Sequence, residues 1–316
     1  MKGVFLDKGS MDIGDIDFSP MKNLIKTWEE YDYSSPEETA KRVETADIVI
    51  TNKVYIGEDI LMRCKNLKLI CVAATGTNNI DLMSARKYQI PVCNAAGYAT
   101  HSVVQHVFSL ILALHTHICE YRNLVLKGEW EKSKHFCLLN YPIIELAGKT
   151  LGIIGYGELG KAVAKTGEAF GLKTVVAESL SGNPAEGRIP MDELLQQSDI
   201  VSLHCPLTVQ TINLIDEKSF KKMKANSILI NTARGGIVNE AHLLEALRTR
   251  QIAGAGIDVL SKEPPQNSIL IKENLPNLIV TPHIAWASAE ARQRLVEEIG
   301  KNIDAFFAGE PRNIVS

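Results

Sequence analysis

Residues 150–178, TLGIIGYGELGKAVAKTGEAFGLKTVVAE, place a glycine-rich turn between an apolar run and an amphipathic segment, and end in a second apolar run. In that turn Gly155, Gly157 and Gly160 form the pattern G-x-G-x-x-G. Because glycines permit a tight turn and let the backbone approach a pyrophosphate, this pattern between a strand and a helix predicts a dinucleotide site. The alternative is a tight strand-to-helix turn that binds no ligand.

The same stretch predicts which dinucleotide is bound. A helix N-terminus offers N–H donors and a positive partial charge, so we expect Glu158 and Leu159 beside the pyrophosphate. Glu178 ends the second apolar run, where an acid accepts hydrogen bonds from the adenosine ribose of NAD and repels the extra phosphate of NADP. The nearest arginine, Arg188, lies ten residues farther along. The sequence therefore predicts NAD as the cofactor, unless Glu178 is only a solvated acid at a strand end.

Short apolar runs alternate with longer helical patterns along the chain, which is typical of α/β folds with parallel sheets. In the first part, the predicted strands cover residues 2–7, 46–51, 67–75 and 90–95. The second part begins with the strand that precedes the glycine-rich turn. Its later predicted strands cover residues 173–178, 198–206, 226–236, 252–260 and 277–283. Asn239 is a suitable N-cap for one intervening helix, and Gly171 is suited to end another.

Two further helical segments indicate how the domains are organised. Residues 102–127 form one long predicted helix, which we expect to serve as a hinge and dimer element. Residues 288–307 form a last predicted amphipathic helix. No predicted strand accompanies this helix, so it cannot form a domain of its own and we expect it to pack on the first domain. The sequence thus predicts two doubly wound parallel-sheet domains. These are a Rossmann dinucleotide-binding domain, residues 99–286, and a smaller discontinuous flavodoxin-like substrate domain or lid, residues 1–98 plus 287–316.

Bulk composition excludes several classes of protein. The chain has 316 residues, a net charge of -3 and a pI of about 6.3, so no basic surplus favours nucleic acid or an anionic membrane. No apolar stretch is long enough to span a bilayer, and Asp7 and Lys8 come too early for a signal peptide. The six cysteines show no spacing typical of a metal site or a disulfide framework. We therefore expect no metal and a reduced, cytoplasmic setting.

The later predicted strands end in polar residues that are unusual at such positions. His204 and Pro206 end one strand, Thr232–Arg234 end the next, and Asp258 and His283 lie at the ends of the last two. Ligands of an open parallel sheet bind outside the carboxyl ends of its strands, so we expect these residues in one crevice. Taken alone, His283 would be an ordinary core or loop histidine; these neighbours make it a functional candidate.

Three residues near these strand ends suit a reaction between NADH and a 2-oxo acid. Arg234 offers a planar fork of donors that can hold a carboxylate and polarise a carbonyl. His283 can donate a proton near neutral pH, because the reference pKa of histidine is about 6.5. Glu263 can orient the imidazole and favour its charged form. In isolation Arg234 and Glu263 could form a surface ion pair, and Asp258 could be a turn residue.

Five segments make the chain resemble the D-isomer-specific 2-hydroxyacid dehydrogenase family over essentially its whole length. They are GIIGYGELGKAVA, HCPLT, NTARGGIVNE, GIDVLSKEPP and TPHIAW. The resemblance implies a catalytic triad of Arg234, Glu263 and His283, in which Arg234 and His283 also contact the substrate. It further implies that Asp258 and the backbone of Thr232 hold the nicotinamide carboxamide.

The resemblance implies roles for two further groups of residues. Pro206 would line the adenosine side of the cofactor, and Ala233 would be among the cofactor contacts. In the segment AATGTNNID, the backbone N–H groups of Ala74, Thr75 and Gly76 would hold the substrate carboxylate. Each of these three residues could instead belong to a simple turn. The resemblance also implies that the first domain closes on the cofactor domain.

Within the family, EWEKSKHFCLLNYPIIELAGKTLGIIGYG and TPHIAWASAEARQRL most resemble glycerate dehydrogenases, also called hydroxypyruvate reductases. The resemblance implies that a homodimer reduces hydroxypyruvate or glyoxylate with NADH to the D-2-hydroxy acid, and catalyses the reverse reaction. Trp130 or Phe136 could reach the substrate of the partner subunit, and Trp286 could form a wall of the site. Two alternatives remain: a different 2-hydroxy acid as substrate, or an NAD-sensing corepressor scaffold, because some relatives with that role keep the same triad.

Overall fold

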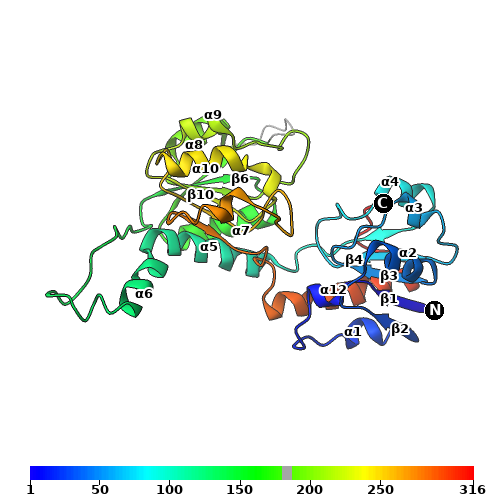
Figure 1. Cartoon of the computed structure of the whole chain (residues 1–316). Coiled ribbons are helices and arrows are strands. Elements are labelled where there is room, and N and C mark those ends of the chain that lie inside the picture. The colour runs from blue at the N-terminus through cyan, green and yellow to red at the C-terminus, as the bar shows by residue number, and fades with distance from the viewer. Residues whose placement is uncertain (180–186) are drawn as a thin grey trace. The chain divides into compact units, whose positions relative to one another are not determined.

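The computed structural model describes residues 1–179 and 187–316 of the chain, which divides into two compact units (Figure 1). Unit 1 comprises Met1–Ala99 and Trp286–Ser316, and unit 2 comprises Thr100–Ala285. Each unit is built around its own parallel sheet, and helices lie on both faces of each sheet. This architecture confirms the predicted fold class of two doubly wound α/β units.

The sheet of unit 1 has five parallel strands in the order β2-β1-β3-β4-β5. The strands are β1 (Lys2–Phe5), β2 (Thr27–Glu30), β3 (Ile48–Thr51), β4 (Leu69–Val72) and β5 (Val92–Cys93). This order is that of flavodoxin-like folds, as predicted. The sequence analysis missed β2, because its sequence TWEE lacks the apolar alternation that identifies a strand, and because β2 lies at the sheet edge.

Alternate residues of these strands point to opposite faces of the sheet. One face, which includes Phe5 and Ile50, packs against α1 (Ser19–Lys22) and α12 (Ala289–Phe307). The other face, which includes Val49, packs against three short helices. These are α2 (Pro36–Glu44), α3 (Glu58–Leu61) and α4 (Leu82–Lys87). Unit 1 therefore has an apolar core on each side of its sheet.

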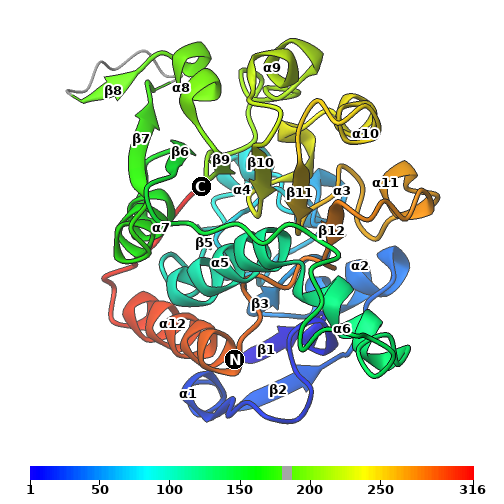
Figure 2. The same ribbon diagram turned by 90° about the vertical axis from the view of Figure 1, so that its left-hand side faces the viewer.

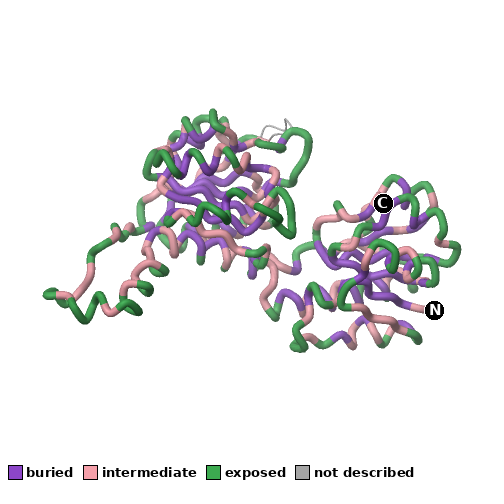
Figure 3. Tube along the Cα trace, viewed as in Figure 1, coloured by how far each residue is buried: buried purple, intermediate pink, exposed green. Residues whose placement is uncertain are grey.

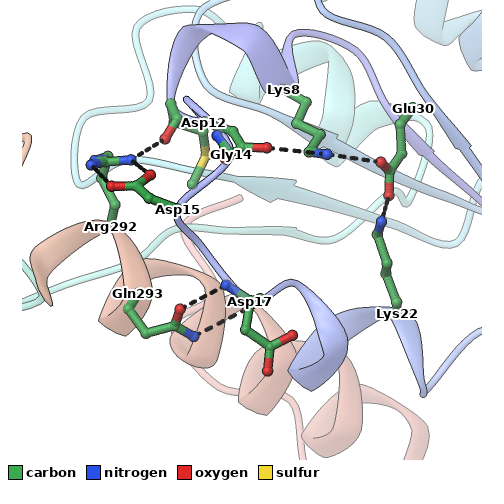
Figure 4. Close-up of polar contacts among 10 residues, drawn as sticks. Lys8, Asp12, Gly14, Asp15, Asp17, Lys22, Glu30, Arg292 and Gln293 are labelled. Atoms are coloured by element: carbon green, nitrogen blue, oxygen red, sulfur yellow. Dashed lines mark hydrogen bonds and ion pairs between the residues drawn. The ribbon is translucent and has the colours of Figure 1, made fainter. Parts of the chain in front are cut away.

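The C-terminal helix α12 belongs to unit 1 although the whole of unit 2 precedes it in the sequence. Ser288 caps its first turn, and the predicted helix over residues 288–307 is confirmed. The Arg292 guanidinium donates two hydrogen bonds of 2.7 Å to the carboxylate of Asp15, and Gln293 exchanges hydrogen bonds with the backbone of Asp17 (Figure 4). These contacts attach α12 to a segment near the start of the chain.

Among its described residues, unit 2 has a sheet of seven parallel strands in the order β12-β11-β10-β9-β6-β7-β8 (Figure 2). They are β6 (Thr150–Ile154), β7 (Lys173–Ala177), β8 (Arg188–Ile189), β9 (Ile200–Leu203), β10 (Ile228–Asn231), β11 (Gly254–Ile257) and β12 (Leu278–Val280). The strand order reverses at β6, which pairs with β7 and β9. Dinucleotides bind at such a reversal, outside the carboxyl ends of the strands. The short strand β8 was not predicted.

Helices cover both faces of this sheet, with α5 and α7 on one side and α8, α9 and α10 on the other (Figure 1). The helices are α5 (Thr100–Thr116), α7 (Glu158–Ala169), α8 (Met191–Gln197), α9 (Glu217–Lys222), α10 (Glu240–Arg248) and α11 (Ile269–Lys272). Asn239 caps α10 and Gly171 follows α7 with a φ of 77°, as predicted. The buried residues concentrate in the sheet (Figure 3).

The prediction of one helix over residues 102–127 is wrong. α5 ends at Thr116, and α6 (Ile118–Leu126) begins after His117 with a bend of 59° between the two helices. His117 has a left-handed φ of 50°, and the carbonyl of His115 accepts a hydrogen bond of 3.0 Å from the N–H of Ile144. The returning chain therefore occupies the acceptor that another turn of α5 would require.

Residues 118–145, which we call the arm, extend away from the sheet of unit 2 (Figure 1). None of the residues of α6 is buried, and the side chains of Phe136 and Leu139 are 90% and 81% exposed. Within the described ranges no single helix is long and apolar enough to cross a membrane. α5 and α6 meet that criterion only as a bent pair, and one side of α5 is buried in unit 2.

Candidate active site

The glycine-rich turn joins β6 to α7 and has the shape that a dinucleotide requires. Gly155 has a φ of 95°, and a Cβ there would lie 2.5 Å from the backbone of His204 and Cys205. A Cβ on Gly160 would overlap the carbonyl oxygen of Gly155. By contrast, a Cβ on Gly157 would meet no atom within 4 Å, so it would project into the open space before α7. This open space at a helix N-terminus fits a pyrophosphate.

Three further residues of the predicted cofactor site follow β6 and β7 in unit 2. Glu158 and Leu159 form the first turn of α7, and the Glu158 carboxylate accepts a hydrogen bond from the Thr100 hydroxyl. Glu178 follows β7 directly and is exposed, with its N–H donating to the carbonyl of Ile189 at 2.9 Å. The carboxylate of Glu178 therefore stands at the carboxyl end of the strand adjacent to β6.

Four neighbouring strands present the other predicted residues at their carboxyl ends. Pro206 follows β9, Thr232 and Ala233 follow β10, Asp258 follows β11, and His283 follows β12. The Thr232 hydroxyl oxygen is buried and has no hydrogen-bond partner in the part of the chain that the structure describes. An unpartnered buried hydroxyl is costly unless a ligand satisfies it, so this atom also fits a bound cofactor.

His283 and Glu263 form a hydrogen-bonded pair, in which Nδ1 of the imidazole lies 2.6 Å from Oε2 of the carboxylate. The second carboxylate oxygen, Oε1, accepts the N–H of Leu260 at 2.9 Å. The two side chains are 24% and 34% exposed, so the pair is partly shielded yet open to a ligand. Because Nδ1 is engaged by Glu263, Nε2 is the nitrogen that can serve a substrate.

Asp258 holds the turn that carries His283. Its carboxylate accepts the N–H groups of Ile284 at 3.0 Å and Ala285 at 2.9 Å and the hydroxyl of Thr281 at 2.5 Å. Its backbone carbonyl accepts the N–H of His283 at 2.8 Å. Asp258 is only 1% exposed, so little of its carboxylate is left for a ligand. This geometry favours a supporting role over the predicted direct contact with the carboxamide.

Arg234 follows β10 in an extended conformation, and the residue is partly buried. Its Nη1 donates to the carbonyl of Ala233 at 2.7 Å, and its own carbonyl accepts from the Asn231 amide at 2.9 Å. The next residue, Gly235, packs so tightly on the backbone of Leu260 that a Cβ there would overlap it. This contact joins the turn of Arg234 to the turn after β11 that ends in Glu263.

The three predicted substrate residues of unit 1 follow β4. The carbonyl of Ala74 accepts the N–H of Ala95 at 3.0 Å, and the carbonyl of Thr75 accepts the Asn94 amide at 2.7 Å. The Thr75 hydroxyl donates to the carbonyl of Ala95 at 2.8 Å. The turn that continues into Gly76 is therefore held from the β5 side, with its carbonyl groups already engaged.

Sequence reasoning missed two features near the His283–Glu263 pair. A cavity of about 800 Å³ lies beside the pair, and Cys119 and Asn123 of α6 contribute to its wall. His106 of α5 lies 3.0 Å from the Thr281 hydroxyl, and its place among the buried apolar residues Val103, Val107 and Leu110 was the available signal. In the described ranges no group of three or more His, Cys, Asp or Glu side chains is placed to hold a metal ion.

Trp130, Phe136 and Trp286, for which the sequence suggested only possible roles, lie in two different parts of the structure. Trp130 and Phe136 lie on the arm, where the Trp130 indole donates to the carbonyl of Phe136 at 2.9 Å. Trp286 lies in unit 1 and packs against Tyr98, with their rings in an edge-to-face arrangement at 6.5 Å. Trp286 is thus partly engaged by the core of unit 1.

Comparison with known proteins identifies the family. A profile described as D-isomer specific 2-hydroxyacid dehydrogenase, NAD binding domain, matches residues 108–285. Glycerate dehydrogenase of Methylorubrum extorquens is 47% identical over 99% of this chain and 98% of its own length. Hydroxypyruvate reductase of Blautia hydrogenotrophica is 36% identical over 100% of both chains. A solved protein of Thermus thermophilus has a TM-score of 0.87 at 33% identity, also over 100% of both chains.

The chain therefore belongs to the D-isomer-specific 2-hydroxyacid dehydrogenase family. It is an NAD-dependent oxidoreductase that reduces 2-oxo acids, and within the family its sequence is most like the glycerate dehydrogenases. The predicted family, enzyme class and cofactor are confirmed.

Proposed function

We propose that the physiological reaction is the NADH-dependent reduction of hydroxypyruvate to D-glycerate, with glyoxylate as a second substrate, and the reverse reaction. The observation that carries the proposal is the 2.6 Å pair of His283 and Glu263 at the end of β12, in the same unit as the glycine-rich turn. The names of the two relatives, glycerate dehydrogenase and hydroxypyruvate reductase, support the choice of substrate.

In this reaction His283 is the proton donor. The nicotinamide, when bound, supplies the hydride that reduces C2 of the oxo acid. His283 gives its Nε2 proton to the substrate carbonyl oxygen, while Glu263 fixes the plane of the ring through its bond to Nδ1. His204 is unsuited to this role, because desolvation lowers its pKa to about 4 and the imidazole is neutral at pH 7.

Arg234 binds the substrate. The Arg234 guanidinium can donate two parallel hydrogen bonds to the carboxylate and carbonyl oxygens, which places and polarises the group to be reduced. In unit 1, the backbone N–H groups of Ala74, Thr75 and Gly76 are assigned to substrate binding by the resemblance to the family. The two hydrogen bonds from Arg234 favour a 2-oxo acid over a simple aldehyde or ketone.

The cofactor is held by unit 2. The backbone of the glycine-rich turn binds the pyrophosphate, and Glu178 binds the adenosine ribose. Thr232 and Asp258 serve the nicotinamide end, Asp258 through the turn that it supports. The residues assigned to the cofactor are Gly155, Gly157, Glu158, Leu159, Gly160, Glu178, Pro206, Thr232, Ala233 and Asp258.

A steady-state assay of NADH absorbance with a panel of 2-oxo acids tests the proposal. We expect the highest kcat/KM for hydroxypyruvate, a lower value for glyoxylate, and a preference for NADH over NADPH, because Glu178 repels the ribose phosphate. Glu178→Gln should reduce the ratio of kcat/KM for NADH to that for NADPH. The ranking of the 2-oxo acids by kcat/KM should stay the same. A higher kcat/KM with NADPH than with NADH would disprove the role of Glu178. Failure to reduce any member of the panel would disprove the function.

We also propose that the protein is a homodimer in the cytoplasm and that the arm forms the contact. A single copy leaves Phe136 and Leu139 almost wholly exposed, and exposed apolar clusters of this kind mark interaction surfaces. All six cysteines are free thiols, which suits a reducing compartment. The double substitution Phe136→Ser, Leu139→Ser should convert the dimer to a monomer, as measured by sedimentation. An equally exposed site away from the arm, Ile13→Ser, is the control. A monomeric wild-type protein would contradict the proposal.

A further inference from the structure

Helix α5 contacts the turn that carries His283 at both ends of that turn. The Ser102 hydroxyl donates to the carbonyl of Ala285 at 2.7 Å. One helical turn later, Nε2 of His106 lies 3.0 Å from the Thr281 hydroxyl. Residues at i and i+4 lie on the same face of a helix, so one face of α5 brackets residues 281–285.

With Asp258 ionised, the donors and acceptors around Thr281 permit one arrangement. The Thr281 oxygen lies 2.5 Å from Oδ1 of Asp258, and an ionised carboxylate can only accept, so the Thr281 hydroxyl donates to Asp258. The Thr281 oxygen must then accept from His106, whose Nε2 therefore carries a proton. The same Nε2 lies 3.4 Å from Oδ1 of Asp258, close enough for a favourable electrostatic contact.

These contacts keep the buried Asp258 ionised. Burial by itself raises the pKa of the Asp258 carboxyl, but the contact with His106 and hydrogen bonds from Thr281 and the N–H groups of Ala285 and Ile284 outweigh burial and lower it. An ionised carboxylate is the stronger acceptor for the two N–H groups that follow His283. The charge on Asp258 therefore helps to hold the backbone on the C-terminal side of the histidine.

The backbone at His283 requires this support. His283 has a φ of 55°, a left-handed conformation that costs a non-glycine residue free energy and persists only where the surroundings impose it. The N–H of His283 is bound to the carbonyl of Asp258 at 2.8 Å. Because His283 belongs to this turn, any relaxation of the turn would move the imidazole relative to Glu263. The movement would disturb the 2.6 Å hydrogen bond between the two side chains.

We propose that His106 is a positioning residue for His283, acting through Thr281 and Asp258. The proposal rests on the proposed function, in which His283 donates the proton. The apolar side chains of Val103, Val107 and Leu110 on α5 are buried, whereas the His106 side chain is 18% exposed. His106 directs an N–H at Thr281, and an apolar side chain of similar size at this position would lack that donor.

Two substitutions at this position separate the hydrogen bond from packing. His106→Phe keeps a ring but removes the donor, whereas His106→Gln places an amide N–H near the position of Nε2. Because misplacement of a reacting group by about 1 Å costs about 100-fold in rate, we expect His106→Phe to lower kcat by up to that factor. We expect His106→Gln to recover most of kcat, and KM for NADH to change little in either variant. His242→Phe, at a histidine that accepts from Glu217, is the control.

A double-mutant cycle guards against a general loss of folding. Thr281→Val removes the hydroxyl through which His106 acts, so we expect the double variant His106→Phe, Thr281→Val to be no slower than the slower single variant. Independent structural damage would instead make the two losses multiply. Circular dichroism establishes that each variant is folded before its kinetics are measured.

Proton NMR provides a readout that does not depend on turnover. The short bond between His283 Nδ1 and Glu263 should give a strongly deshielded imidazole proton, assigned by its loss in His283→Gln. We expect this resonance in the wild type, in His106→Gln and in His242→Phe, and its weakening or loss in His106→Phe. If His106→Phe kept both the resonance and the wild-type kcat, the proposal would be overturned. A wild-type protein that reduced no 2-oxo acid would instead refute the proposed function, while the resonance would still test the positioning role.

Discussion

Replacing His283 by alanine is expected to lower kcat by about a thousandfold, because a positioned general acid contributes roughly 100- to 10,000-fold. The structure supplies the parts of such an acid: an imidazole at the end of β12 with Nδ1 bound to Glu263 at 2.6 Å. His204 is neutral at pH 7, because desolvation lowers its pKa to about 4, so it cannot replace His283. The kcat of the purified variant with hydroxypyruvate and NADH is the measurement.

The binding of NADH should separate this role from damage to the site. The glycine-rich turn and Glu178 are unchanged in His283→Ala, so NADH affinity, measured by quenching of protein fluorescence, should stay within about threefold of the wild type, which is less than 1 kcal/mol. His242→Ala is a matched control, because His242 contacts α9 and not the His283 turn. A variant that retained more than a tenth of the wild-type kcat would show that the proton comes from another group.

Replacing Arg234 by glutamine is expected to lower kcat/KM for the 2-oxo acid by about 100- to 1,000-fold, the usual cost of removing a donor that stabilises developing charge. Glutamine keeps a single amide donor but loses the positive charge and the planar fork. Arg234→Lys keeps the charge without the fork, so we expect an intermediate loss expressed mainly in KM. Initial rates over a range of substrate concentrations give both parameters.

A surface arginine provides the control for this experiment. Arg248 forms an ion pair with Glu273 at 2.6 Å, and both side chains are more than a third exposed. Exposed pairs of this kind contribute little free energy, so Arg248→Gln should match the wild type in kcat, KM and stability. If Arg234→Gln also matched the wild type, Arg234 would not be the residue that binds the substrate carboxylate.

Much of the fold could be predicted because its signals are local. The apolar strands, the glycine-rich turn and the caps at Asn239 and Gly171 depend on residues close together in the chain. The failures share one physical cause. The break at His117 depends on Ile144, which returns to the His115 carbonyl, and β2 is a strand because it pairs with β1. Neither contact can be predicted from the pattern of residues close by in the sequence.

The same division applies to the site. The family, the cofactor and the candidate roles of Arg234, Glu263 and His283 could be predicted without a structure, because strand ends carry distinctive residues and neighbouring parallel strands end at one sheet edge. Only the folded structure shows that the Asp258 carboxylate accepts three hydrogen bonds from the His283 turn and that His106 reaches this turn. Those contacts join residues up to 175 positions apart in the sequence, and hydrogen bonds over such separations exist only once the sheet and α5 have packed together.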